Sequence, residues 1–234
     1  RASKITKRYA FYTAITGGYE QVKVPEFFDE EFDYYLFTDD ENLEVFEPFI
    51  KVVLNKFEID PTRLARWVKL NPHRLLPNYE CVVWVDSNIL VKNSLLPYIR
   101  KVELSRADIG MYPHPDRKNF IEEVDACRDL TKDDDTELLN QLEVYKSKTN
   151  FDEINGVTLI ESNVFVVNLQ SKKSKVFFAC WHAELFKRSR RDQLSLPYVL
   201  SKIKPNLIML EYSRSLIPRF NKKVYEIYNH SASI

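Results

Sequence analysis

A short polar motif follows an apolar run near residue 86 and has the chemistry of a cation site. Residues 81–85 read CVVWV, a continuous apolar stretch that predicts a strand covered on both faces. Asp86, Ser87 and Asn88 come directly after it. A carboxylate there is costly to leave unpaired, so we expect Asp86 to meet a metal ion, a cationic side chain or several donors. Ligands of open α/β sheets bind just beyond the carboxyl ends of strands, which makes Asp86 the first candidate.

A basic helix is predicted just before this strand. Asp60 and Pro61 have the residue types of an N-cap and a first helical position. Arg63, Arg66 and Lys69 then recur at i, i+3, i+6 spacing. Two interpretations are open: these side chains form a solvated basic face, or Arg66 and Lys69 reach the ligand-binding edge and neutralise phosphates.

Two N-terminal strands, residues 7–16 and 32–38, each lead into a polar turn. A glycine pair ends the first, but the chain has no G-x-G-x-x-G pattern and no Walker lysine there, so an ordinary turn is an equal alternative to a nucleotide site. Asp39 and Asp40 follow the second strand. Either acid could bond a ribose or a base edge, or cap the next turn, and we favour the cap for Asp40.

Polar residues also break an apolar pattern further along the chain. Glu161, Ser162 and Asn163 are expected to interrupt a strand within residues 157–168, at a place where a sheet presents groups to a ligand. His114 lies between two prolines, which predicts a rigid loop with an exposed imidazole.

A later acid, Asp192, is expected to begin a helix together with Gln193, and Pro197 is expected to shorten or kink that helix. Four basic residues lie just before it, within residues 187–191. They are interpreted as a solvated cluster, with contact to an anionic acceptor or to lipid headgroups as the alternative.

The composition is that of an ordered globular protein of one domain over residues 1–234. Hydrophobic residues make up 44% and aromatic residues 13%, and Lys+Arg balance Asp+Glu at 34 each, so no global charge directs the chain to nucleic acid or a membrane. Three widely spaced cysteines predict buried free thiols in a reducing compartment. No apolar run approaches ~20 residues, so no transmembrane segment is predicted. We expect a cytoplasmic location, with peripheral attachment to a membrane as the alternative.

The order of these elements resembles nucleotide-sugar glycosyltransferases of the GT-A fold, in which a basic helix leads into a buried strand that ends in Asp-x-Asp. A closer resemblance is to a glycosyltransferase-like domain family, first catalogued as of unknown function, with plant cell-wall and mucilage proteins and proteins of bacterial surface-polysaccharide gene clusters. It covers roughly residues 8–230. The runs that carry it are RWVKLNPHRLLPNYECVVWVDSNI, HPDRKNFIEEV, LIESNVFVVN and RRDQLSLPYVL.

The resemblance implies a single Rossmann-like GT-A domain of the α/β class, with a mostly parallel central sheet flanked by helices. It also implies transfer of a sugar from a nucleotide-diphosphate donor, for which a UDP-sugar is expected, to a glycan or glycolipid acceptor in polysaccharide biosynthesis. No nucleic-acid partner is expected. By the same resemblance Asp192 and Glu161 are catalytic, with Asp192 as the general base if the enzyme inverts and as an orienting group if it retains. A helix N-cap is the alternative role for Asp192.

The residues that the resemblance assigns to the donor are Tyr12, Thr13, Ala14, Asp39, Arg66, Lys69, Asp86, Ser87, Asn163 and Gln193. Mn²⁺ or Mg²⁺ would be held by Asp86, Asn88 and His230, although His230 is equally well interpreted as a tail residue. Asn88 departs from Asp-x-Asp and carries no charge, so we expect weaker metal binding, and a metal-independent enzyme that uses Arg66 and Lys69 is an alternative.

Two other functions are compatible with the sequence. One is a non-catalytic nucleotide-sugar or carbohydrate-binding module with a degenerate metal site, which Asn88 favours and the three acids Asp86, Glu161 and Asp192 oppose. The other is a nucleotidyltransferase, which the first glycine turn opposes because it has no basic residue of the kind such enzymes use.

Overall fold

A seven-stranded sheet forms the centre of the protein. The structure is a computed structural model that describes residues 7–18, 20–55, 59–148, 150–211 and 222–229. The strand order is β3-β2-β1-β4-β7-β6-β8, and β7 runs antiparallel to its two neighbours in an otherwise parallel sheet. The strands are β1 (Tyr9–Ile15), β2 (Phe32–Thr38), β3 (Phe49–Val53), β4 (Cys81–Val85), β6 (Ile109–Pro113), β7 (Ile160–Asn168) and β8 (Leu207–Met209). A separate antiparallel pair consists of β5 (Ile89–Val91) and β9 (Tyr225–Ile227).

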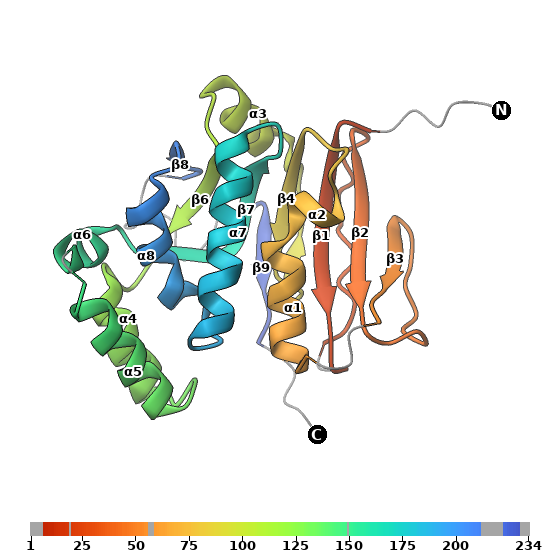
Figure 1. Ribbon diagram of the computed structural model, residues 1–234. Helices are drawn as coiled ribbons and strands as arrows, with labels where there is room; N and C mark the ends of the chain where they lie inside the picture. Colours follow the sequence, from red (N-terminus) through yellow and green to blue (C-terminus); the bar gives the residue numbers. More distant parts are fainter. Residues whose placement is uncertain (1–6, 19, 56–58, 149, 212–221, 230–234) are drawn as a thin grey trace.

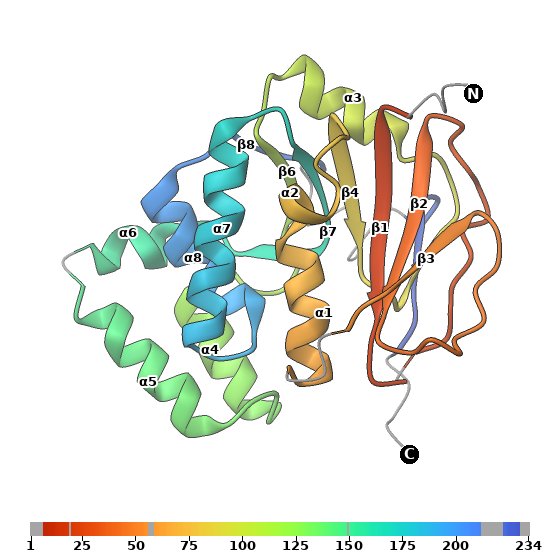
Figure 2. The same cartoon turned by 45° about the vertical axis from the view of Figure 1, so that its right-hand side comes forward.

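Helices cover both faces of this sheet. Figures 1 and 2 show α1 and α7 side by side over one face with α8 beside them, and α4 and α5 together at one end. On the other face, Ile99 and Val102 of α3 pack against β4 and β7. The helices are α1 (Pro61–Leu70), α2 (Pro72–Leu75), α3 (Leu96–Leu104), α4 (Phe120–Asp129), α5 (Asp135–Lys146), α6 (Phe151–Gly156), α7 (Lys172–Lys187) and α8 (Asp192–Ile203). None of the helices in the described part of the chain has the length and apolar content needed to cross a bilayer.

The predicted fold class is confirmed: the chain forms a mixed α/β structure around a mostly parallel sheet. The buried strand β4 spans residues 81–85 with all five residues buried, and β2 has the predicted bounds. Helix α1 begins as expected, with the Asp60 carboxylate accepting a hydrogen bond from the backbone N–H of Arg63 at 3.0 Å. All three cysteines are free, and Cys81 and Cys127 are buried.

Three local predictions are wrong. The polar run 161–163 does not interrupt β7, which is continuous. Helix α8 continues past Pro197 to Ile203, so the proline does not shorten it. His114 is buried with 1% exposure, because its Nδ1 accepts hydrogen bonds from two backbone N–H groups, those of Asp116 and Arg117.

The polar run nevertheless marks an irregularity in the pairing of β7 with β6. Gly110 lies opposite Val166, and Tyr112 lies opposite Glu161. The two paired positions are two residues apart on β6 but five residues apart on β7. Extra residues on one strand form a bulge, which bends the strand and re-aims side chains. The bulge lies where β7 approaches β4, since the N–H of Asp86 donates to the carbonyl of Asn163 at 2.8 Å.

Candidate functional site

The predicted polar residues gather at one edge of the sheet. The carboxyl ends of β1, β2, β4 and β6 lie at this edge, and β7 begins there because it is antiparallel. The edge therefore holds Asp39 after β2, Asp86 after β4 and Glu161 near the start of β7. Helix α8 also begins there, since Ser162 of β7 donates a hydrogen bond to Asp192 at 2.8 Å.

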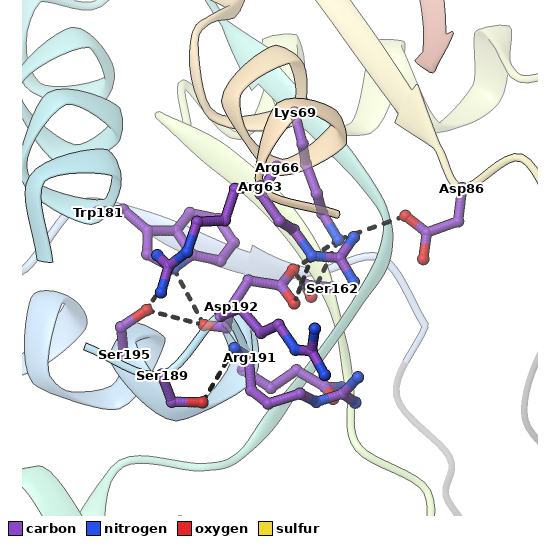
Figure 3. Close-up of polar contacts among 12 residues, drawn as sticks. Arg63, Arg66, Lys69, Asp86, Ser162, Trp181, Ser189, Arg191, Asp192 and Ser195 are labelled. Atoms are coloured by element: carbon purple, nitrogen blue, oxygen red, sulfur yellow. Dashed lines mark hydrogen bonds and ion pairs between the residues drawn. The ribbon is translucent and has the colours of Figure 1, made fainter. Parts of the chain in front are cut away.

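Four side chains form a charged cluster in which Lys69 and Asp192 are buried and Arg66 and Asp86 are partly buried. The Nζ atom of Lys69 lies 2.6 Å from Oδ2 of Asp192 and 3.3 Å from Oδ1 of Asp86. The Nε atom of Arg66 lies 3.3 Å from Oδ1 of Asp192. Figure 3 shows these side chains converging from α1, from the end of β4 and from the start of α8. The cluster contains two cations and two carboxylates, so its charges balance.

The basic side of α1 is not solvated, so that interpretation is wrong. Lys69 is 1% exposed, and its ammonium lies over the rings of Trp84 and Phe165, 5.7 and 5.9 Å from their centroids. Arg63 donates to the backbone carbonyls of Leu185 and Arg188 near the end of α7. Because residues three apart lie on one side of a helix, α1 directs its basic side chains together toward the rest of the protein.

The carboxylate of Asp86 has the cationic and hydrogen-bond-donor partners expected at the end of a buried strand. Besides Lys69, the indole N–H of Trp84 donates to Oδ1 of Asp86 at 2.6 Å. Trp84 and Asp86 are two residues apart, so a strand of period two places both side chains on the same face of the sheet. The carboxylate orientation is therefore set by groups on β4 and α1.

The Trp84→Phe substitution tests this hydrogen bond, because it keeps an aromatic ring and removes the N–H. We expect the free energy of unfolding to fall by about 1.5–3 kcal/mol, the range for hydrogen bonds to charged groups. Urea denaturation at neutral pH measures it. In the Asp86→Ala variant, Trp84→Phe should reduce the free energy of unfolding by less, because the hydrogen-bond acceptor is absent. Equal reductions with and without Asp86 would contradict the Trp84–Asp86 hydrogen bond.

Asp192 is held in its ionised form by its surroundings. Burial on its own raises the pKa of this carboxyl group, but Arg66, Lys69 and Arg191 outweigh that effect and hold the pKa well below its ordinary value. A carboxylate with a strongly depressed pKa accepts a proton poorly. This arrangement favours an orienting role for Asp192 over proton abstraction.

Stability in acid should depend on Asp192. Its folded-state pKa is depressed below the unfolded value of about 4, so its stabilising contribution is present above that pH and is lost as the pH falls. Between pH 5 and pH 2 we expect the unfolding free energy of the wild type to fall more steeply than that of Asp192→Asn. Urea denaturation at several pH values checks this, with the exposed Asp116→Asn as the control that should follow the wild type. Parallel profiles for the wild type and Asp192→Asn would refute the expectation.

The predicted metal ligands fit a divalent cation in part. Asn88 is 7% exposed, and its side-chain N–H donates to the carbonyl of Tyr228 at 2.9 Å. Its Oδ1 is buried and has no hydrogen-bond partner among the described residues. Such an oxygen suits Mn²⁺ or Mg²⁺. His230 lies outside the described residues, and within them no group of three His, Cys, Asp or Glu side chains is arranged to hold a metal ion.

The residues of β1 divide between the two faces of the sheet. Tyr12 and Ala14 belong to the apolar core, and the Tyr12 hydroxyl donates to the carbonyl of Lys69 at 2.8 Å. Thr13 lies on the other face and lines a small pocket together with Asp86 and Ser87. The cavity of about 10 Å³ holds about one water, so a nucleoside would need it to widen. The Oγ1 atom of Thr13 is buried there without a partner in the described residues.

The two acids after β2 both bind backbone groups. Asp39 accepts hydrogen bonds from the N–H of Gly17 at 3.0 and 3.1 Å, so it joins the turns after β1 and β2. Asp40 accepts from the N–H of Asn42 at 2.8 Å, which confirms its role as a turn cap.

Glu161 lies apart from the charged cluster. It neighbours Ser162, and successive side chains on a strand point to opposite faces, so Glu161 faces away from Asp192. Asn163 donates to Glu161 at 3.0 Å. Gln193 is buried and lies 3.5 Å from the carbonyl of Ile160. Glu161 and Asp192 are therefore not brought together as a pair.

Sequence reasoning missed one supporting residue, Trp181, and gave Ser162 no role of its own. Trp181 of α7 donates its indole N–H to the carbonyl of Asp192 at 3.0 Å and to Ser195 at 3.1 Å, which fixes the first turn of α8. Nothing in the spacing of Trp181 relates it to Asp192. Ser162 lies in the polar run 161–163, which marked its neighbourhood.

A mostly parallel sheet with a balanced charged cluster at its carboxyl edge places this molecule among the α/β domains, whose ligands bind at that edge. The chain belongs to the family described as TOD1/MUCI70, glycosyltransferase-like domain, which matches residues 12–215. The resemblance stated from the sequence is thereby confirmed. A comparison with curated proteins finds no match to this chain.

Proposed function

We propose that this protein is a glycosyltransferase that moves a sugar from a nucleotide-diphosphate donor, a UDP-sugar, to a glycan or glycolipid acceptor in polysaccharide biosynthesis. The observation that carries the proposal is the position of Lys69. Its buried ammonium joins Asp86, at the end of β4, to Asp192, at the start of α8. It thereby fixes two carboxylates at the edge where α/β sheets bind nucleotides.

Binding of the donor is assigned to the β1–β4 side of this edge. Thr13 and Ser87 line the pocket beside Asp86 and would contact the nucleoside once the pocket widens. The unpartnered hydroxyl of Thr13 supports this, because a buried polar atom without a partner is costly in the unliganded protein. Asp39 contributes by holding the turn after β1 in place.

Departure of the nucleotide develops negative charge on the diphosphate. A divalent cation, if bound, would be held by Asp86 and Asn88 and would stabilise that charge electrostatically. Lys69 and Trp84 orient the Asp86 carboxylate. Asp192, kept ionised by its cations, orients the sugar and does not remove a proton. Glu161 and Asn163, on the other face of β7, contact the acceptor side.

A second candidate function is a binding module that holds a nucleotide sugar without transferring it. Asn88 favours this candidate, since it replaces a charged ligand by a neutral one. The depressed pKa of Asp192 also favours it, because this carboxylate is not poised as a base.

Calorimetric titration with a panel of UDP-sugars, with and without Mn²⁺, tests the proposal, followed by an assay for slow hydrolysis of any donor that binds. Binding with hydrolysis supports the transferase, and binding without hydrolysis or transfer supports the module. Absence of binding by every nucleotide sugar overturns both. Free UDP and the corresponding free sugar are the controls that locate the recognised part of the donor.

A further inference from the structure

A second group of cations lies near Asp192. It consists of Arg117, which follows β6, Lys132, which follows α4, and Arg191, which precedes α8. We call these three residues the second basic cluster, to distinguish them from the basic residues of α1. Figure 3 shows Arg191 beside Asp192. These residues come from three separate connections, so their association is a property of the folded chain.

Hydrogen bonds at Asp133 fasten two of these connections together. Its carboxylate accepts from the Ser189 hydroxyl at 2.5 Å and from the N–H of Arg190 at 3.2 Å, and it forms an ion pair with Arg190 at 3.4 Å. Lys132 precedes Asp133 and Arg191 follows Arg190, so both cations are carried by this junction. The interpretation of residues 187–191 as a solvated cluster holds for the exposed Lys187 and Arg190, whereas Arg188 and Arg191 are partly buried.

Arg117 joins the group through Glu123 of α4. The two side chains form an ion pair, and the Glu123 side chain is wholly buried. The carboxylate of Glu123 also accepts from the thiol of Cys127, whose carbonyl accepts from the N–H of Lys132 at 3.0 Å. Glu123 therefore lies beneath the group and compensates one of its three charges.

The other two charges form no direct ion pair with a carboxylate in the described ranges of the chain, although Arg191 acts at longer range on Asp192 and Glu123 on Lys132. Neither Arg191 nor Lys132 forms an ion pair there, and the Nε atom of Arg191 is buried without a hydrogen-bond partner. Burial together with repulsion from Arg191 and Arg117 lowers the pKa of Lys132. A buried donor without an acceptor, beside mutually repelling cations, is the environment that an anion would relieve.

We propose that Arg117, Lys132 and Arg191 bind an anionic group, a phosphate or a carboxylate, carried by the sugar acceptor. The assignment to the acceptor rests on the proposed function. The donor is placed beside β1 and β4, whereas this cluster lies beside β6 and α8. In the strand order β6 lies beyond β7, which contacts Asp192 through Ser162. An acceptor anchored there by its charge would approach Asp192 from the side opposite the donor.

Two soluble probes distinguish the sources of the anion: geranyl phosphate for a lipid phosphate and trigalacturonate for an acidic glycan, with geraniol and galactotriose as uncharged counterparts. Calorimetry on the full chain at low salt should show that one charged probe binds at least tenfold more tightly than its counterpart. Lys132→Gln and Arg191→Gln should each weaken that probe about tenfold, with a smaller loss at high salt. Arg117 is left intact because Glu123 would otherwise be buried unpaired.

Lys172→Gln is the matched control, since it removes one charge from an exposed lysine at the start of α7, at the opposite edge of the sheet. It should leave the probe affinity unchanged. The proposal is overturned if neither charged probe exceeds its uncharged counterpart, or if the two cluster variants behave like Lys172→Gln. It is also overturned if Lys132→Gln weakens the binding of UDP as strongly as the binding of the probe, because the cluster would then bind the donor. Probe binding without any nucleotide-sugar binding would instead refute only the proposed function.

Discussion

Asp86→Ala is expected to lower the rate of donor turnover by about 10²–10³-fold, the cost of removing one preorganised electrostatic group from a site of charge development. Asp86 ends β4, lines the pocket with Thr13 and Ser87, and is oriented by Trp84 and Lys69. Hydrolysis or transfer of the donor identified by calorimetry measures the effect. The dependence of donor turnover on a divalent cation should also change in this variant, because Asp86 is the only charged metal ligand proposed among the described residues.

Glu41→Gln is the control for this experiment, because it removes an exposed carboxylate from the loop after β2. Its turnover should equal that of the wild type. If Asp86→Ala turns over donor at the wild-type rate, Asp86 has no part in the chemistry. If donor binding is changed neither by EDTA nor by Asp86→Ala, the metal role fails while the transferase proposal stands.

Lys69→Met is expected to reduce the free energy of unfolding by about 3–5 kcal/mol, the range found when one partner of a buried ion pair is removed. The side chain keeps its length and apolar contacts with Trp84 and Phe165 but loses its charge. Asp192 would then retain only Arg66 as a close ion-pair partner in the described structure, at 3.3 Å. Urea denaturation at neutral pH provides the measurement.

A double-mutant cycle separates the ion pair from the packing. Asp192→Asn should reduce the cost of Lys69→Met, because the carboxylate that needs compensation is then absent. Lys172→Met, at an exposed position, is the matched control and should change stability little. A Lys69→Met protein as stable as the wild type would show that the cluster adds nothing to the folded state.

Local patterns predicted much of the secondary structure. The bounds of β2 and β4 and the start of α1 follow from apolar runs and capping residues, which act between neighbours in the chain. The His114 prediction failed for the complementary reason. A histidine between prolines is polar by type, yet it is buried here because nearby backbone N–H groups satisfy its ring nitrogen.

The sequence predicted individual residues of the candidate site but not which of them contact one another. Asp86, Arg66 and Lys69 were identified from their positions beside a buried strand. The partnership of Lys69 with Asp192 could not be inferred from spacing, since the two residues are distant in the chain and meet only where α1 and α8 approach the same edge of the sheet.

The sequence by itself determined the α/β class, the strand that ends in Asp86, the start of the basic helix and the family, because each depends on short-range periodicity or on ordered motifs. Only the tertiary structure decided that Lys69 and Arg66 form ion pairs with Asp192, that Glu161 faces away from it, and that two cations near it lack an ion pair among the described residues. The physical reason is that burial and charge balance depend on which distant segments meet. The strand order and the bulge in β7 determine which distant segments contact each other, and no local sequence pattern predicts these features.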